Sequence, residues 1–246
     1  MLLNKIIQKK INQDFKGKHY ILTGYSSGIG NRIHKDLSKL GSKVILLGRH
    51  IVKSPLFFNC DLRDVNSLEE TVKKISKKYS RIDGFIHCAG LNQCIKIEKI
   101  KISDWENILS VNLTSAFIIS KEIKKNLIKS KNPSIVFVSS IAGHRKSVVS
   151  GVHYVTSKAG LIGMSKQLAY EFGKDKIRIN CISPSQTISK MLKKSMNKYQ
   201  INNLIKNIPL GRLATAEDQS HGVIFLLSSF SKYISGTSMN IDGGQI

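Results

Sequence analysis

The sequence predicts an α/β protein of a single domain, a doubly wound parallel sheet with helices on both faces. Short apolar runs alternate with longer segments of helical periodicity from about residue 19 to the C-terminus. This alternation is typical of parallel strands joined by crossover helices. A glycine-rich segment, Gly24 to Gly30, follows the first apolar run and precedes the first helical segment. In doubly wound sheets such a segment forms the tight turn from strand to helix.

Length and composition fit one globular domain with a short N-terminal extension. The chain has 246 residues, of which 41% are hydrophobic, and no repeat or linker divides it. We expect an extension over residues 1–16 and the α/β domain over residues 17–246. Apolar residues of the extension are spaced like one face of a helix, which favours packing on the body or on a neighbouring subunit.

Hydropathy and cysteine usage predict a cytoplasmic protein. No apolar run reaches the roughly 18–20 residues that span a bilayer. The extension is interrupted too often for a secretory signal, and it contains no Arg to favour organelle targeting. The four cysteines show no Cys-x-x-Cys pairing and stand far apart, so we expect them to be reduced.

The chain is strongly basic, with a formal net charge of +23. A basic surface can bind nucleic acid, an anionic membrane, or an acidic substrate or carrier protein. The alternative is that Lys is simply the common polar surface residue of this chain. The lysines are spread over the whole length, and there is no Arg-rich arm, zinc-finger spacing or aromatic–basic interleaving. We favour this alternative, expect no membrane partner, and regard nucleic acid as the weaker hypothesis.

The individual elements follow from local patterns. The expected strands are short apolar runs bounded by turn-forming residues: 19–23, 43–47, 56–59, 82–88, 134–138, 176–182 and 238–241. The expected helices cover 30–40 and 67–79, a long segment that begins at a capping box over 103–106 and carries Asn112, a segment opened by Tyr154 that runs through 159–172, and 216–229.

The glycine-rich segment has the composition of a phosphate loop. Gly24 permits a tight turn, Gly28 lets the backbone approach a pyrophosphate, and Gly30 lets the helix pack on the strand. The N-terminus of the following helix offers free N–H groups to the phosphates. A plain turn is the alternative, and the order strand, loop, helix favours the phosphate loop.

The end of the second strand predicts the choice of cofactor. A fold that prefers NAD usually has an acidic residue there, which holds the ribose 2′-hydroxyl. This chain has Gly48 followed by Arg49. A guanidinium suits the 2′-phosphate of NADP, whereas a solvated loop arginine is the alternative.

Tyr154 and Lys158 stand four residues apart at the start of an expected helix, so their side chains share one face. A phenol normally loses its proton near pH 10, and a neighbouring ammonium lowers that value. Such a pair can exchange a proton with an alcohol or ketone near neutral pH. An exposed Tyr and Lys without chemistry is the alternative for so short a motif.

The polar segments after the strands are expected to meet, because ligands of such sheets bind beyond the carboxyl ends of the strands. In their order and spacing, these segments resemble the short-chain dehydrogenases/reductases of the single-domain type from about Gly17 to Gly244. The resemblance rests on Thr23–Gly30, Asp61-Leu62, Ala89-Gly90, Asn112, Ser140, Tyr154-x-x-x-Lys158 and Ile241–Gly244.

The resemblance implies a Rossmann-type oxidoreductase that moves a hydride between a nicotinamide cofactor and a ketone or secondary alcohol. Tyr154 would be the general acid/base, Lys158 would lower its pKa and hold the ribose, and Ser140 would orient the substrate oxygen. Asn112 would anchor a water in a proton relay. The implied cofactor-binding residues are Thr23, Gly24, Ser26, Ser27, Gly28, Ile29, Gly30, Arg49, Asp61, Leu62, Ala89, Gly90, Tyr154, Lys158, Pro184, Thr187 and Ser189.

We expect NADP(H) rather than NAD(H), no metal, and a homotetramer or homodimer formed through the Asn112 and Tyr154 helices. The substrate candidates are 3-oxoacyl groups on a carrier protein and keto sugars or polyols. Two hypotheses of other classes remain: a nicotinamide-binding regulator without turnover, and a basic nucleic-acid-binding protein on this fold. The presence of Asn112, Ser140, Tyr154 and Lys158 together argues against the regulator.

The chain departs from the family pattern at three places. His87-Cys88 stands where the family often has Asn-Asn, and Ser185 follows Pro184 where Gly is usual. The segment 144–146, His-Arg-Lys, stands where small and apolar residues are usual. These charges either face solvent, which we favour slightly, or line the substrate mouth and select an anionic substrate.

Overall fold

The computed structural model describes residues 2–188 and 198–246. Its centre is a seven-stranded sheet with the order β3-β2-β1-β4-β5-β6-β7. Every neighbouring pair is parallel, from β1–β2 to β6–β7. The strands are β1 (His19–Thr23), β2 (Lys43–Gly48), β3 (Phe57–Asn59), β4 (Gly84–His87), β5 (Ser134–Val138), β6 (Arg178–Pro184) and β7 (Ser238–Ile241). The predicted doubly wound fold is therefore confirmed.

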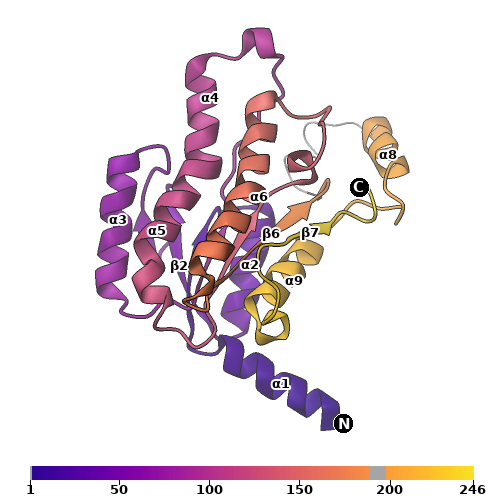
Figure 1. Cartoon of the computed structure of the whole chain (residues 1–246). Helices are drawn as coiled ribbons and strands as arrows, with labels where there is room; N and C mark the ends of the chain where they lie inside the picture. The colour runs from indigo at the N-terminus through magenta and orange to yellow at the C-terminus, as the bar shows by residue number, and fades with distance from the viewer. Residues whose placement is uncertain (1, 189–197) are drawn as a thin grey trace.

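Helices cover both faces of the sheet (Figure 1). The helices are α1 (Leu2–Phe15), α2 (Gly28–Lys39), α3 (Val65–Lys78), α4 (Ile102–Leu109), α5 (Ser115–Leu127), α6 (Val152–Gly173), α8 (Lys198–Lys206) and α9 (Ala216–Leu227). Short helical turns are η1 (Ile97–Lys99), η2 (Ser110–Thr114), η3 (Ile141–Gly143) and η4 (Ser229–Ser231).

Each face of the sheet carries its own apolar core. One core joins the sheet to α3, α5 and α6, and the other joins it to α1, α2 and α9. Strand residues alternate between the two, so that Ile21 belongs to the first core and Leu22 to the second. This period of two is what a strand buried on both faces requires.

The N-terminal extension forms α1, which packs on the second core through the fully buried Phe15. The Asp14 carboxylate accepts a hydrogen bond from the Ser229 backbone N–H at 2.8 Å, and its carbonyl accepts one from the Tyr20 hydroxyl at 3.2 Å. The predicted helix that packs on the body is therefore present.

The long helix predicted around Asn112 differs from the structure in two respects. It begins at Ile102, where the Asp104 carboxylate accepts the Lys101 backbone N–H, so the predicted capping box at 103–106 is wrong. It is also divided: η2 is a π-helical turn of five residues between α4 and α5. A π turn inserts one extra residue and changes the direction in which the following side chains point.

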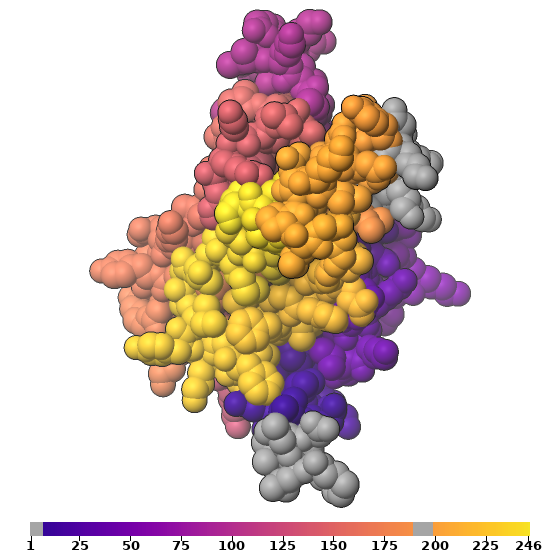
Figure 2. Space-filling view, turned by 90° about the vertical axis from the view of Figure 1, so that its right-hand side faces the viewer, coloured from indigo at the N-terminus to yellow at the C-terminus, as the bar shows by residue number. Residues whose placement is uncertain are grey.

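The C-terminal residues pack against the segment that follows α8. Figure 2 shows the segment that contains α8 lying against the C-terminal residues. The Leu210 backbone N–H donates to the Gly243 carbonyl at 3.1 Å. In residues 2–188 and 198–246, no helix combines the length and apolar character needed to cross a bilayer.

Candidate functional site

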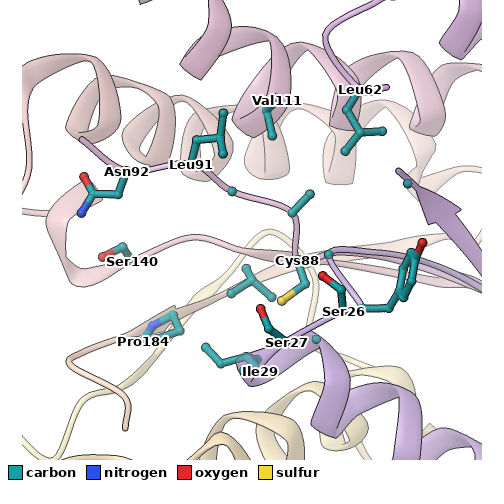
Figure 3. Close-up of a pocket in the computed structure, with 18 of the residues that line it drawn as sticks. Ser26, Ser27, Ile29, Leu62, Cys88, Leu91, Asn92, Val111, Ser140 and Pro184 are labelled. Atoms are coloured by element: carbon teal, nitrogen blue, oxygen red, sulfur yellow. The ribbon is translucent and has the colours of Figure 1, made fainter. Parts of the chain in front are cut away.

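A cavity of ≈ 870 Å³ opens at the carboxyl ends of the strands. The loop after β1, the ends of β2 to β6 and the start of α6 line it. Figure 3 shows Ser26, Ser27 and Ile29 on one wall near Cys88, Leu62 and Val111 on the facing wall, and Asn92, Ser140 and Pro184 at one end. A cavity at this edge is where doubly wound sheets bind their ligands.

Most residues proposed from the sequence lie around this one cavity. Those that line it are Gly24, Ser26, Ser27, Gly28, Ile29, Gly30, Arg49, Asp61, Leu62, Ala89, Gly90, Ser140, Tyr154, Lys158, Pro184 and Thr187. Thr23 and Asn112 lie behind the lining and are fully buried. Ser189 lies outside the described residues.

The glycine-rich loop forms a close turn over β4. Gly24 has a φ of 73°, and a Cβ there would lie 2.5 Å from the Ala89 backbone nitrogen. A Cβ on Gly30 would collide with the Gly24 carbonyl. Gly28 has a φ of 53°, and a Cβ there would meet no atom within 4 Å. The loop thus leaves an open cradle at the N-terminus of α2, which fits a diphosphate.

The end of β2 carries positive charge. A Cβ on Gly48 would lie 3.2 Å from the Tyr25 ring, which occupies the space beside it. The Arg49 side chain is 61% exposed, and its Nη1 lies 3.7 Å from Asp61 Oδ2. Arg63 binds the Asp61 carboxylate more closely, with Nη2 at 2.6 Å from Oδ2. Because Arg63 already neutralises Asp61, Arg49 is available to a ligand anion.

Lys158 is 4% exposed and has no carboxylate partner among the described residues. Its Nζ donates to the Val138 carbonyl at 2.8 Å and lies 5.6 Å from the centroid of the Tyr154 ring. Burial lowers the pKa of Lys158 to about 8. Because burial removes water from around the ammonium, the hydroxyl groups of a ligand could accept its hydrogen bonds instead.

Tyr154 and Ser140 line the same cavity, and the Ser140 hydroxyl influences the pKa of the phenol. Burial raises the pKa of Tyr154, and the Ser140 hydroxyl acts in the opposite direction. The sequence predicted a lowered pKa caused by Lys158. The structure differs because desolvation of the phenol exceeds the stabilisation of the phenolate. The phenol is consequently protonated at neutral pH and can donate a proton.

The side-chain amide of Asn112 is fully engaged within the protein. Its Oδ1 accepts the Leu91 backbone N–H at 2.8 Å, and its Nδ2 donates to the Leu91 carbonyl at 3.0 Å and to Ser157 Oγ at 2.9 Å. Ser157 Oγ in turn donates to the Tyr154 carbonyl at 2.7 Å. Asn112 thus ties Leu91, on the cavity wall, to the first turn of α6.

The start of α6 is fixed against the end of β5. Ser139 Oγ donates to the Lys158 carbonyl at 2.8 Å. A Cβ on Gly143 would lie 2.8 Å from the Lys158 carbonyl carbon, so only Gly permits this approach. These contacts place Tyr154 and Lys158 opposite Ser140.

The segment after β6 completes the cavity. Thr187 Oγ1 donates to the Ser185 carbonyl at 3.1 Å. Ser185 Oγ is buried and has no hydrogen-bond partner in the described structure. A buried hydroxyl without a partner beside a cavity fits a ligand that brings a polar group.

The charged residues of segment 144–146 are exposed and do not line the cavity. His144 Nε2 lies 3.0 Å from Ser183 Oγ and 3.1 Å from Ser238 Oγ. Arg145 Nη1 donates to the Gln245 carbonyl at 3.0 Å. The location agrees with the solvent-facing interpretation of this segment.

Several lining residues were not named as individual site residues from the sequence, although some fall within the predicted strand-end segments. They are Tyr25, Leu47, Gly48, His50, Cys60, Cys88, Leu91, Asn92, Val111, Val138, Ser139, Ser185 and Ile188. Most adjoin a predicted residue, so extending each strand-end segment by one or two positions would have found them. Val111 adjoins the predicted Asn112 and lies in the π turn η2. The described residues contain no group of three or more His, Cys, Asp or Glu suited to a metal.

Comparisons with known proteins agree on the class of protein. The family model described as enoyl-(acyl carrier protein) reductase matches residues 24–245. The chain is 34% identical over 244 residues to the 3-oxoacyl-[acyl-carrier-protein] reductase FabG of Rickettsia typhi, covering 95% of this chain and 98% of that protein. FabG of Buchnera aphidicola is 33% identical, with coverages of 92% and 96%.

Solved structures share the whole fold. Aldohexose dehydrogenase of Thermoplasma acidophilum, in ligand-free form, superimposes with a TM-score of 0.87 at 29% identity, covering 94% of this chain and 95% of that one. A short chain dehydrogenase of Leptospira borgpetersenii with bound NAD+ gives a TM-score of 0.86 at 28% identity, with coverages of 95% and 94%.

Proposed function

Because this chain belongs to the short-chain dehydrogenase/reductase family and is an oxidoreductase acting on CH–OH and C=O groups, we propose that it reduces a 3-oxoacyl group with NADPH. The observation that supports this most directly is the convergence of Tyr154, Ser140 and Lys158 on one cavity. A hydroxyl pair that meets at one point can bind and protonate a single carbonyl oxygen.

In the proposed mechanism the nicotinamide cofactor, when bound, supplies the hydride. The phosphate loop and Arg49 would hold its phosphates, and Lys158 its ribose. Ser140 donates a hydrogen bond to the substrate carbonyl oxygen and orients it. Tyr154, protonated at neutral pH, gives its proton to that oxygen as the carbonyl carbon is reduced. Asn112 holds the start of α6 and Leu91 in position at the cavity wall.

The preference for NADP(H) rests on charge. Gly48 leaves no carboxylate where an NAD-preferring site has one. Among the described residues, the exposed Arg49 guanidinium has no ion-pair partner closer than Asp61, at 3.7 Å. A guanidinium beside the ribose binds a phosphate far better than a hydroxyl.

The choice of a 3-oxoacyl thioester rests on the relatives and on the cavity mouth. Two relatives are 3-oxoacyl-carrier-protein reductases by name, each covered along nearly all its length. Leu91 and Ile188 line the cavity and are each 39% exposed, an apolar surface that suits an acyl chain better than a polyol. The aldohexose dehydrogenase supplies the second candidate, a sugar substrate.

The test is NADPH oxidation with a 3-oxoacyl thioester, on a carrier protein and on a small thiol, beside a keto sugar. We expect turnover of the thioesters, and a loss of kcat by about 10²–10⁴ in Tyr154→Phe. The NADPH dissociation constant should change little in that variant. Retained activity in Tyr154→Phe would refute the proton-donor role, and preference for the sugar would support the second candidate.

We also propose that the protein is a homodimer or homotetramer through the outer faces of α5 and α6. Phe117 on α5 and Tyr170 on α6 are 48% and 84% exposed. Exposed apolar surface on these helices would favour a subunit contact if the side chains form one patch. Light scattering of the protein and of Phe117→Lys decides this, since a monomer in both cases would contradict it.

A further inference from the structure

The imidazole of His87 is fully buried at the carboxyl end of β4 and takes no part in the proposed chemistry. Each of its ring nitrogens has a partner on a different element. Nδ1 lies 3.0 Å from Thr23 Oγ1, at the end of β1, and Nε2 lies 3.2 Å from the Asn112 carbonyl oxygen in η2. His87 therefore connects the phosphate-loop strand to the π turn.

These partners determine where the imidazole proton resides. A carbonyl oxygen only accepts, so Nε2 must carry the hydrogen and Nδ1 must accept from the Thr23 hydroxyl. Thr23 Oγ1 is in turn the acceptor of the Ala89 backbone N–H at 3.3 Å. The hydrogen bonds consequently run in one direction, from Ala89 through Thr23 and His87 to Asn112.

The π turn is what makes a donor necessary. Its closing bond runs from the Ser115 N–H to the Ser110 carbonyl, five residues back. This spacing removes neighbouring carbonyls from the ordinary helical ladder. Ser115 Oγ donates to the Val111 carbonyl at 2.8 Å, and His87 serves the Asn112 carbonyl. A buried carbonyl without a donor would favour rewinding of the turn.

The position of this turn matters to the cavity. The Asn112 side chain holds both backbone groups of Leu91, and through Ser157 it reaches the Tyr154 carbonyl. A Cβ on Gly90 would lie 3.4 Å from Lys158 Nζ and 3.7 Å from Asn112 Oδ1. Lys158 and Asn112 therefore lie beside the same cavity-lining residue, Gly90.

We propose that His87 is a positioning residue, which as a neutral imidazole with the hydrogen on Nε2 holds the π turn and thereby places Asn112, Leu91 and the start of α6 for catalysis. Burial, followed by the charge of Lys158, lowers the pKa of His87 to about 3, so the donor stays the same across neutral pH. The catalytic part of this inference rests on the proposed reductase function; the tautomer does not.

The first test is nitrogen-15 NMR of the seven histidines in the ligand-free protein. The His87 signals are identified by their loss in His87→Gln. We expect the shifts of an Nε2–H tautomer, constant between about pH 5 and pH 9, where an ordinary histidine titrates. An Nδ1–H tautomer, or titration near pH 6.5, would overturn the proposal even if the protein proved not to be a reductase.

The second test compares His87→Phe, which keeps a ring but offers no hydrogen bond, with His87→Gln, whose amide can reach the Asn112 carbonyl. We expect kcat to fall by about tenfold in His87→Phe and by less than about threefold in His87→Gln, the scale of one buried hydrogen bond. The NADPH dissociation constant, measured by fluorescence, should stay within about twofold in both.

Ser134→Ala is the matched control for destabilisation alone. Ser134 Oγ is buried and donates to the Leu226 carbonyl at 3.0 Å, at the opposite end of the sheet. We expect a lower Tm and unchanged kcat there. Equal kcat in His87→Phe and wild type, or an equal loss in His87→Phe and His87→Gln, would refute the positioning role. Wild-type protein that binds NADPH but reduces no ketone would refute the proposed function and leave the NMR result standing.

Discussion

At the scale of single residues, Lys158 occupies a place where its charge is costly. It is 4% exposed, without a carboxylate partner in the described part of the chain, and its pKa is lowered to about 8. The unfolded chain binds this proton more tightly than the folded protein, so folding is opposed below pH 8 and the penalty disappears above the ordinary value near 10.5. The buried cation beside Tyr154 therefore lowers the folding stability of the protein.

We therefore predict that Lys158→Met is more stable than wild type and inactive. The gain in the free energy of unfolding should be about 1–3 kcal/mol at pH 7, in line with the pKa difference, and should vanish near pH 10.5. Urea unfolding of the ligand-free proteins at both pH values measures it. Lys166→Met on the same helix is the control, and an equal gain there would contradict this explanation.

Arg49 carries the second prediction at this scale. Arg49→Ala should raise the KM for NADPH by about tenfold or more, because a charge-assisted contact with the 2′-phosphate is lost. The KM for NADH should change by less than about twofold, since NADH lacks that phosphate. Arg63→Ala is the matched control, because Arg63 binds Asp61 rather than lining the cavity. Parallel changes for both cofactors would contradict the preference.

Residue-scale prediction from the sequence succeeded where the relevant spacing lies within one segment. The glycines of the phosphate loop, and Tyr154 with Lys158, could be placed from their own neighbours. His87 and Ser139 could not, because their partners are 25 to 64 and 19 residues away along the chain. Their roles depend on contacts that only the folded sheet creates.

At the scale of elements, Arg178 closes the C-terminus of α9. Arg178 is the first residue of β6. Its guanidinium donates to the carbonyls of Leu226, Leu227, Ser228 and Ser231 at 2.7 to 3.3 Å. Cations at a helix C-terminus also meet the negative end of its dipole. The last turn of α9 thus depends on a side chain from the central sheet.

We predict that Arg178→Met lowers the free energy of unfolding by about 3–5 kcal/mol, because several buried carbonyls lose their donor. Arg178→Lys should recover only part of the loss, since an ammonium has three donors rather than a planar set of five. Chemical denaturation measures both. Arg212→Met, at an exposed arginine, is the control; a loss there as large as in Arg178→Met would contradict the role.

The strands were predictable, and the division between α4 and α5 was not. β1, β5 and β7 have the predicted bounds, since each is an apolar run bounded by turn residues. The π turn follows no local signal in Val111-Asn112-Leu113, because its Asn112 carbonyl is bound by His87, which is 25 residues away along the chain. The capping box was misplaced because Asp104 caps a position that itself lacks a capping side chain.

At the scale of the whole molecule, stability should fall on mild acidification. His87 has a pKa near 3 when folded and 6.5 in its ordinary state, so its contribution is fully present above pH 6.5 and is lost as pH falls toward 3. His19 and His34 are shifted in the same direction. All three favour the folded state only while neutral.

We predict that wild-type protein loses at least about 2 kcal/mol of unfolding free energy between pH 7 and pH 5, the share that His87 alone contributes. His87→Gln should lose about 2 kcal/mol less over the same interval. Urea denaturation at the two pH values provides the comparison. Equal pH dependence in both proteins would show that His87 is not kept neutral by the fold.

The strand order has a consequence for how the chain is made. In β3-β2-β1-β4-β5-β6-β7, every strand from β2 onward joins a free edge of the sheet already formed by the strands before it. No strand has to be inserted between two others, so a chain emerging N-terminus first can extend the sheet without opening a completed ladder. The phosphate loop and Arg49 are synthesised before the segment that carries Tyr154 and Lys158. During synthesis the segments proposed to hold the nucleotide phosphates are therefore made before the proposed proton donor.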